Sequence, residues 1–231
     1  MKFKNLCFIF VLCLFSFLCV GCKKKDIEEY EKLRQAEIKK WEVIEATYKE
    51  EGYYDKNIKG SILVTKDSFS SSSSSSSSLS QIGHAAIMLN PNNVVEANPD
   101  GDGEVGVTSG VHLGANNWNK TDRKKTCYQA LPRVEENCEV ASEKQMERAA
   151  NWCENQIGKH YLWPIYYDFD LKCFVYPRWK TERNKFYCSH LVWAGYKDAV
   201  DIDLAPGAIS WVSPGDLLNK KYVKVIYSRK K

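Results

Sequence analysis

Short apolar runs separated by turn residues make up most of this chain. Runs of this length, bounded by Gly, Asn, Pro or Ser, are typical of buried strands, and they predict strands over residues 62–64, 85–89, 94–97, 127–131 and 222–227. Residues 142–157 and 188–197 instead carry apolar side chains at helical spacing, and Ser142 is a suitable N-cap. Strands, then helix, then strand predict an α+β domain over about residues 55–231, with an antiparallel sheet and packed helices.

Two segments lack such a pattern and are predicted as loops. Nine consecutive serines, Ser70 to Ser78, have no apolar side chain to bury and should form a flexible connection between two of the strands. The aromatic stretch from Tyr161 to Trp179 is interrupted by Pro164 and Pro177, which disfavour continuous secondary structure.

The N-terminus has the pattern of an export signal. Lys2 and Lys4 precede an uncharged, mostly apolar run over residues 6–21, which is shorter than the roughly 20 residues of a membrane-spanning helix. The end of this run, Leu18 to Cys22, resembles a bacterial lipobox. We therefore expect residues 1–21 to be a signal peptide, and lipidated Cys22 to anchor the protein to a membrane of the bacterial cell envelope. The alternative is an ordinary signal whose cleavage releases a secreted protein.

Residues 22–54 are predicted to be the lipidated cysteine followed by a charged helical tether. From Asp26 to Glu51 the chain is dense in Glu and Lys, and apolar residues recur mostly every three or four positions. This pattern favours an amphipathic helix that serves as a stalk or a packing helix and ends at Gly52.

Composition narrows the function classes. With 231 residues, 44% of them hydrophobic and 27% charged, the chain is globular rather than disordered or fibrous. A net charge of +4 is too small to predict a nucleic-acid partner. Four of the nine cysteines lack CxxC spacing, so we expect neither a metal site nor a cofactor. After export they would form two disulfides in any of three connectivities, or remain thiols in a reducing habitat. These four are Cys127, Cys138, Cys153 and Cys173.

Cys188 is the best candidate nucleophile. It begins a predicted helix, and the partial positive charge of a helix N-terminus favours a thiolate. His190 lies two residues further along and points away, because two positions rotate a side chain by about 200° around a helix. His84, after Gly83 at the start of a strand, is the preferred base, whereas His112 and His160 lie in sequence that predicts turns.

The segments 83–88, 94–97, 158–161 and 186–193 together resemble the circularly permuted papain-like hydrolases of the YiiX/YebB type, which are relatives of the NlpC cell-wall peptidases. The resemblance covers about residues 59–218, and Tyr-Cys-Ser-x-Leu-Val-Trp is its most specific part. It implies a permuted papain-like fold with Cys188 as nucleophile, His84 as base and Glu96 as third residue. Gly60-Ser61 departs from the Gly-Asp that the family often has there.

Strand geometry leaves the third residue open. If residues 90–93 form a four-residue loop, alternation puts Glu96 on the face opposite His84; a loop of three or five residues, or a bulge, restores it. Asn98 and Asp100 are then alternative partners for the imidazole. For the oxyanion we expect the backbone N–H of Cys188, with the Tyr187 side chain as a second candidate. Tyr161, in a segment that carries the resemblance, is a further candidate for contact with the oxyanion or the substrate.

The resemblance implies a cysteine amidase or peptidase without a cofactor, anchored in the envelope and acting through a thioester. Its expected partners are a peptidoglycan stem peptide, or another amide substrate, and the membrane that holds Cys22. Two alternatives stay open. One is an acyl-amide or lipid hydrolase, or an acyltransferase, whose acyl groove the aromatic residues 161–179 would line. The other is a binding lipoprotein that has the fold but no activity.

Overall fold

The structure is a computed structural model. It describes residues 28, 31–66, 83–99, 109–120, 126–162, 166–168, 173–175, 179–208 and 211–230. The chain divides into two compact units. The larger comprises Glu37–Pro164 and Arg178–Lys231, and the smaller comprises Met1–Ala36 and Ile165–Pro177. In the smaller unit, β8 (Tyr166–Asp168) and β9 (Cys173–Val175) pair as an antiparallel hairpin.

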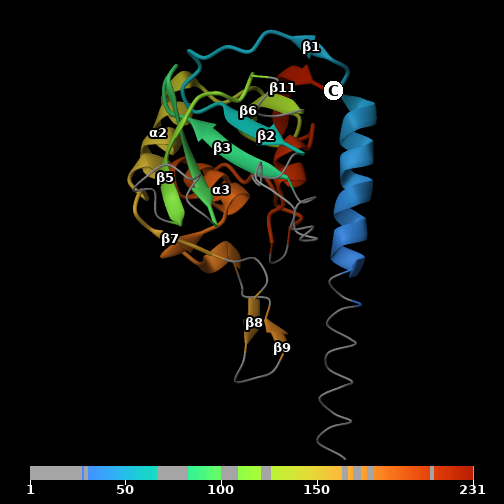
Figure 1. Ribbon diagram of the computed structural model, residues 1–231. Coiled ribbons are helices and arrows are strands. Elements are labelled where there is room, and N and C mark those ends of the chain that lie inside the picture. Colours follow the sequence, from blue (N-terminus) through green and yellow to red (C-terminus); the bar gives the residue numbers. More distant parts are fainter. Residues whose placement is uncertain are drawn as a thin grey trace, which may run out of the picture. The chain divides into compact units, whose positions relative to one another are not determined.

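The larger unit contains a seven-stranded sheet in which every neighbouring pair is antiparallel (Figure 1). Its spatial order is β1-β11-β6-β2-β3-β4-β5. The strands are β1 (Glu51–Gly52), β2 (Ile62–Thr65), β3 (His84–Met88), β4 (Asn93–Asn98), β5 (Gly110–Ala115), β6 (Cys127–Pro132) and β11 (Val223–Arg229). The predicted strands correspond to β2, β3, β4, β6 and β11, so the α+β class with an antiparallel sheet is confirmed.

Both predicted internal helices are present. In α2 (Glu143–Glu154) the Ser142 side chain accepts a hydrogen bond from the Gln145 backbone, and Gln145 reaches back to Ser142, which forms a capping box. Helix α3 (Cys188–Val200) packs against α2 and against β3 (Figure 1). Two short 3-10 helices, η2 (Trp179–Thr181) and η3 (Pro214–Leu218), are also described.

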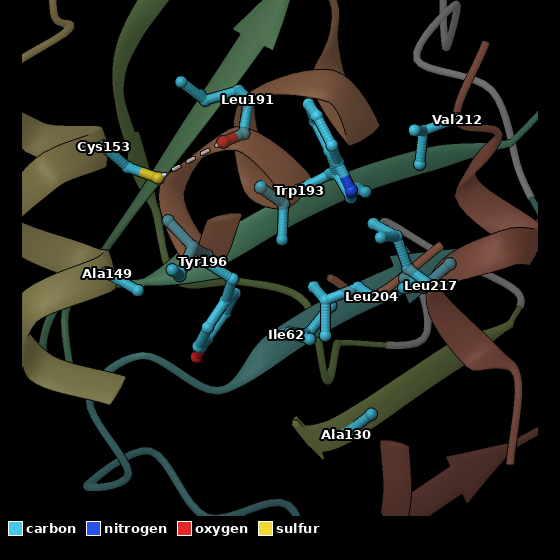
Figure 2. Close-up of a cluster of buried hydrophobic side chains, with 14 of the residues drawn as sticks. Ile62, Ala130, Ala149, Cys153, Leu191, Trp193, Tyr196, Leu204, Val212 and Leu217 are labelled. Atoms are coloured by element: carbon cyan, nitrogen blue, oxygen red, sulfur yellow. Dashed lines mark hydrogen bonds between the residues drawn. The ribbon is translucent and has the colours of Figure 1, made fainter. Parts of the chain in front are cut away.

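The main core lies where these helices cover the sheet. Figure 2 shows side chains of α3 gathered with residues from α2, from β2 and from the segment around η3. Here Leu191 and Tyr196 are fully buried, and the Tyr196 hydroxyl donates to the backbone carbonyl of Gly60. This packing fixes the position of α3, and therefore of its first residue, against the strands.

An N-terminal helix is described at residue 28 and over residues 31–47, and it ends before the predicted Gly52, which belongs to β1. Trp41 and Ile44 of its second half are buried in the main core. Lys40 lies 3.0 Å from Glu37 and 2.7 Å from Asp216 in η3. Residues 37–47 therefore serve as a packing helix. Among the described residues, no helix is long and apolar enough to cross a membrane.

Three predictions need correction. The aromatic stretch is not all loop, because it contains β7 (His160–Tyr161), β8 and β9, and β7 pairs in parallel with β10 (Lys185–Phe186). His112 and His160 lie on strands rather than in turns. Two disulfides among the four cysteines require all four, yet Cys138 is an exposed free thiol and Cys153 a buried one. The Cys153 thiol lies between α2 and α3 and donates to the Leu191 carbonyl at 3.5 Å, so packing holds it away from other cysteines.

Candidate active site

His84 is positioned by an unusual backbone at the start of β3. Gly83 has a φ of +88°, a conformation that side chains other than glycine rarely adopt. A Cβ added at Gly83 would also lie 2.8 Å from the buried ring of Trp41. The chain therefore turns tightly against the N-terminal helix and enters β3 with His84, which is only 4% exposed.

Glu96 lies on the same face as His84. In the β3–β4 register Met88 pairs with Val94 and Ala86 with Glu96, so five residues connect the first pair. Since side chains alternate along a strand, His84 and Ala86 share a face, and Glu96 shares it with them. The His84 Nε2 donates to Glu96 Oε2 at 2.9 Å. Of the two geometries that the sequence left open, the structure has the one that brings Glu96 to His84.

The other predicted partners take different places. Asn98 is buried, and its side-chain nitrogen lies 3.3 Å from His112 Nε2. Asp100 lies outside the described residues, as do Cys22 and the serine run.

Cys188 lies where β3 and β4 separate. The two strands pair only from Ala86 to Met88, although β4 continues along β5 to Asn98. Met88 exchanges backbone hydrogen bonds with Gly60 and Ser61 on the β2 side, so by alternation the Ala85 N–H faces β4. That N–H donates to the sulfur of Cys188. The opening between the strands thus admits the N-terminus of α3 and lets its first side chain reach His84.

Charge coupling stabilises the reactive form of Cys188. Burial raises the pKa of the thiol and is the largest single influence. The charge of His84, its hydrogen bond to the sulfur, and the backbone N–H groups of Ala85 and Ser189 outweigh burial, so the pKa of Cys188 lies below its ordinary value.

The imidazole shows the opposite balance. Burial lowers the pKa of His84, but the charge and hydrogen bond of Cys188, followed by those of Glu96, raise it above its ordinary value. Because Glu96 occupies Nε2, Nδ1 remains to exchange a proton with the thiol. The two opposite shifts favour transfer of the thiol proton to the imidazole, whose other nitrogen faces the Glu96 carboxylate.

The N-terminus of α3 also offers hydrogen-bond donors. Tyr187 is the N-cap residue of α3, and its side chain makes no capping hydrogen bond among the described residues. The Cys188 N–H belongs to the first turn of the helix, where backbone donors lack intrahelical partners. The Tyr187 hydroxyl accepts a hydrogen bond from the Val212 N–H at 3.0 Å, and the Ser189 hydroxyl donates to the Val212 carbonyl at 2.8 Å. Both side chains thus hold the segment before η3 beside Cys188, so the Tyr187 hydroxyl is engaged in packing this segment.

Two predicted residues lie at the margin of the site. Tyr161 is half-buried on β7 and pairs with Phe186, two residues before Cys188. His190 is fully buried among the rings of Phe186, Tyr187 and Trp193. Burial, followed by the charge of Arg183, lowers the pKa of His190 to about 3, so this histidine is neutral and packs as an aromatic side chain.

Two residues near the triad were missed in the sequence. The Trp118 ring stacks on the His84 imidazole, with centroids 5.6 Å apart and planes at 21°. His112 on β5 lies directly opposite Glu96 in the register, with Nε2 3.6 Å from Glu96 Oε1. The sequence does contain a signal for this strand, because Gly110, His112 and Gly114 stand at alternate positions and would lie on one face of a strand. Glycines on both sides of a histidine indicate that another group fills the space on that face.

Comparison of the chain with models of protein families, with curated proteins and with solved structures found no match.

Proposed function

We propose that this protein is a cysteine hydrolase that cleaves amide bonds through a thioester intermediate. One observation carries the proposal: Cys188, at the N-terminus of α3, is hydrogen-bonded to His84, whose other ring nitrogen is 2.9 Å from Glu96. A helix N-terminus, a base and an orienting carboxylate are the arrangement that activates a nucleophilic thiol. An inert buried cysteine needs none of these neighbours.

In the first half-reaction the Cys188 thiolate attacks the carbonyl carbon of the amide and forms the C–S bond. Negative charge moves to the carbonyl oxygen, which the backbone N–H of Cys188 is placed to stabilise. As the C–N bond breaks, His84 gives its proton to the departing nitrogen, and an amine leaves. Glu96 holds the ring so that Nδ1 faces the reacting atoms throughout.

In the second half-reaction His84, now neutral, takes a proton from water as the water oxygen attacks the thioester. The C–S bond breaks and the acid product leaves. The released sulfur is again a thiolate beside an imidazolium, so the enzyme returns to its starting protonation state.

The proposed fold is permuted papain-like, and the proposed substrate is the peptidoglycan stem peptide. The antiparallel α+β fold and the order of His84 before Cys188 in the chain agree with the family that the sequence resembles. An export signal with lipidation at Cys22 would hold the enzyme at the cell envelope, where this substrate lies. Substrate class and location both rest on the sequence resemblance.

The test uses the purified mature protein and its Cys188→Ala and His84→Ala variants, with His190→Phe as a matched control that changes a buried histidine outside the triad. Each is incubated with purified peptidoglycan and, separately, with lipid amides, and released amines are measured. We expect the first two variants to lose at least about a hundredfold in rate, whereas the control keeps activity. Unchanged hydrolysis in both variants would contradict the proposal, and cleavage of lipid amides alone would replace the substrate.

A further inference from the structure

Glu96 has a second histidine beside its other carboxylate oxygen. Its Oε2 accepts from His84 on β3, and its Oε1 faces His112 Nε2 on β5 at 3.6 Å. Glu96 and His112 are direct cross-strand partners, and His112 is 8% exposed. A buried carboxylate is costly unless both oxygens are compensated, and each oxygen of Glu96 has one imidazole.

Strand β5 leaves room for this contact. Gly110 and Gly114 are the neighbours of His112 on the same face, at two residues to either side. A Cβ added at Gly114 would collide with Glu96 Oε1. Of these three positions of β5, only His112 places a side chain toward Glu96. The absence of a side chain at Gly114 leaves room for the carboxylate.

Hydrogen bonds fix the His112 ring. Its Nδ1 lies 3.1 Å from the Gly110 carbonyl, which can only accept, so Nδ1 carries a proton. Its Nε2 contacts both the Asn98 amide at 3.3 Å and Glu96 Oε1. When Nε2 is also protonated, it donates toward the carboxylate. The ring is thus held in a single orientation, with the edge that faces Glu96 set by Asn98 and Gly110.

The charges of the site favour such a partner. A thiolate at Cys188, an imidazolium at His84 and a carboxylate at Glu96 sum to one negative charge, and all three side chains are buried. Glu96 is faced by His84 from β3 and by His112 from β5, and through His84 by Cys188 from α3. A donor at Oε1 favours the ionised carboxylate, which in turn favours the imidazolium and the thiolate.

We infer that His112 is a positioning residue, which holds the second oxygen of Glu96 and acts through Glu96 and His84 on the reactivity of Cys188. The inference rests on the proposed function, since it extends the same triad. It assigns to β5 a place in the site that the sequence did not predict.

The experiment measures the rate at which iodoacetamide alkylates Cys188 in the mature protein between pH 4 and 9. The rate is read from the Cys188 peptide by mass spectrometry, because Cys138 is exposed and also reacts. His112→Leu keeps the side chain's bulk without a donor, and His112→Gln keeps an N–H donor. We expect His112→Leu to move the acid limb upward by about one pH unit, and His112→Gln by less than half as much.

Identical pH profiles for wild type and His112→Leu would overturn the inference. Equal shifts in His112→Leu and His112→Gln would also overturn it, because the shift would then come from loss of the ring's shape rather than from loss of a hydrogen-bond donor. If His112→Leu does not fold, Asn98→Ala replaces it, since it releases His112 Nε2. The Asn98 amide nitrogen can donate to Nε2 only while Nε2 lacks a proton, so its removal favours the ring that donates to Glu96. A downward shift of the acid limb is therefore expected for Asn98→Ala, and an unchanged limb contradicts the inference. A wild-type Cys188 that reacts no faster than a free thiol at neutral pH would instead refute the proposed function.

Discussion

Two regions of this domain each bury a histidine, and they shift its pKa in opposite directions. His84, at the start of β3, is 4% exposed, and His190, on the side of α3, is fully buried. The pKa of His84 is raised above its ordinary value, whereas that of His190 is lowered to about 3. His190 lies only two residues from Cys188 in the sequence, whereas His84 comes from a distant strand, so proximity along the chain does not explain the contrast.

The neighbours explain it. Burial lowers the pKa of both imidazoles, because it penalises the charged form. At His84 a thiol and a carboxylate reverse that penalty. At His190 the neighbours are the rings of Phe186 and Tyr187, with centroids 5.1 and 5.2 Å away, and the cation Arg183 adds to it. A histidine two residues from Cys188 on the same helix therefore stays neutral, because it is buried among aromatic rings and beside a cation rather than beside an acidic group.

The largest expected effect concerns stability in acid. His190 has a depressed pKa in the folded protein, so below about pH 6.5 the unfolded chain binds a proton that the folded protein refuses. The stability that the neutral, buried His190 contributes is fully present above about pH 6.5 and is lost as the pH falls toward 3. The loss amounts to about 3 kcal/mol by pH 4. We expect His190→Phe, which preserves the aromatic packing, to abolish this loss.

This loss of stability is measured by urea unfolding at pH 7 and pH 4, with wild type and His190→Phe compared at each pH. The free energy of unfolding should fall by less in the variant than in wild type, by roughly the amount given above. Parallel losses in the two proteins would mean that His190 takes up its proton in the folded state as readily as in the unfolded one.

The next effect separates the two histidines by reactivity. His84→Gln removes the base while keeping a hydrogen-bonding side chain beside Glu96, and the thiol of Cys188 then remains buried without its imidazolium. Since burial alone raises the pKa of Cys188, we expect alkylation of this residue at pH 7 to slow by about a hundredfold. His190→Phe should change the rate by no more than about twofold. Equal slowing in both variants would show that burial, rather than the ion pair, controls the thiol.

Sequence reasoning identified the parts of this site that short-range rules govern. A cysteine at a helix start and a histidine after glycine at a strand start are local patterns, and both were placed correctly. The strands that flank His84 are apolar runs rich in branched residues, and this local composition is enough to predict a strand. The capping box at Ser142 is likewise a local signal that the structure reproduces.

What the sequence did not contain was the register and the strand β5. Whether Glu96 faces His84 depends on one residue in the turn after Met88, where Leu89 and Asn90 both donate to the Asn93 carbonyl. No periodicity specifies that choice. The sequence around His112 was predicted as a turn because Gly110 and Gly114 weaken a strand pattern. Those glycines accommodate neighbours from distant parts of the chain, Lys159 and Glu96, so the reason for them is visible only in three dimensions.

The smallest expected effect tests that reason. Gly114→Ala adds one methyl group on the face of β5 that bears His112, where it would collide with Glu96 Oε1. Because that contact would be far closer than van der Waals distance, the carboxylate must move away, which weakens its support of His84 without removing any charge. We expect alkylation of Cys188 at pH 6 to slow by roughly threefold. The rate at pH 9 should stay unchanged, because His84 and the backbone N–H groups still hold the pKa of Cys188 below its ordinary value and the thiol is ionised there in both proteins. The matched control is Leu113→Ala, on the adjacent position of β5, whose side chain is 47% exposed. If both variants slow the reaction equally, the effect comes from disturbing the edge strand, and the glycine has no specific role beside the carboxylate.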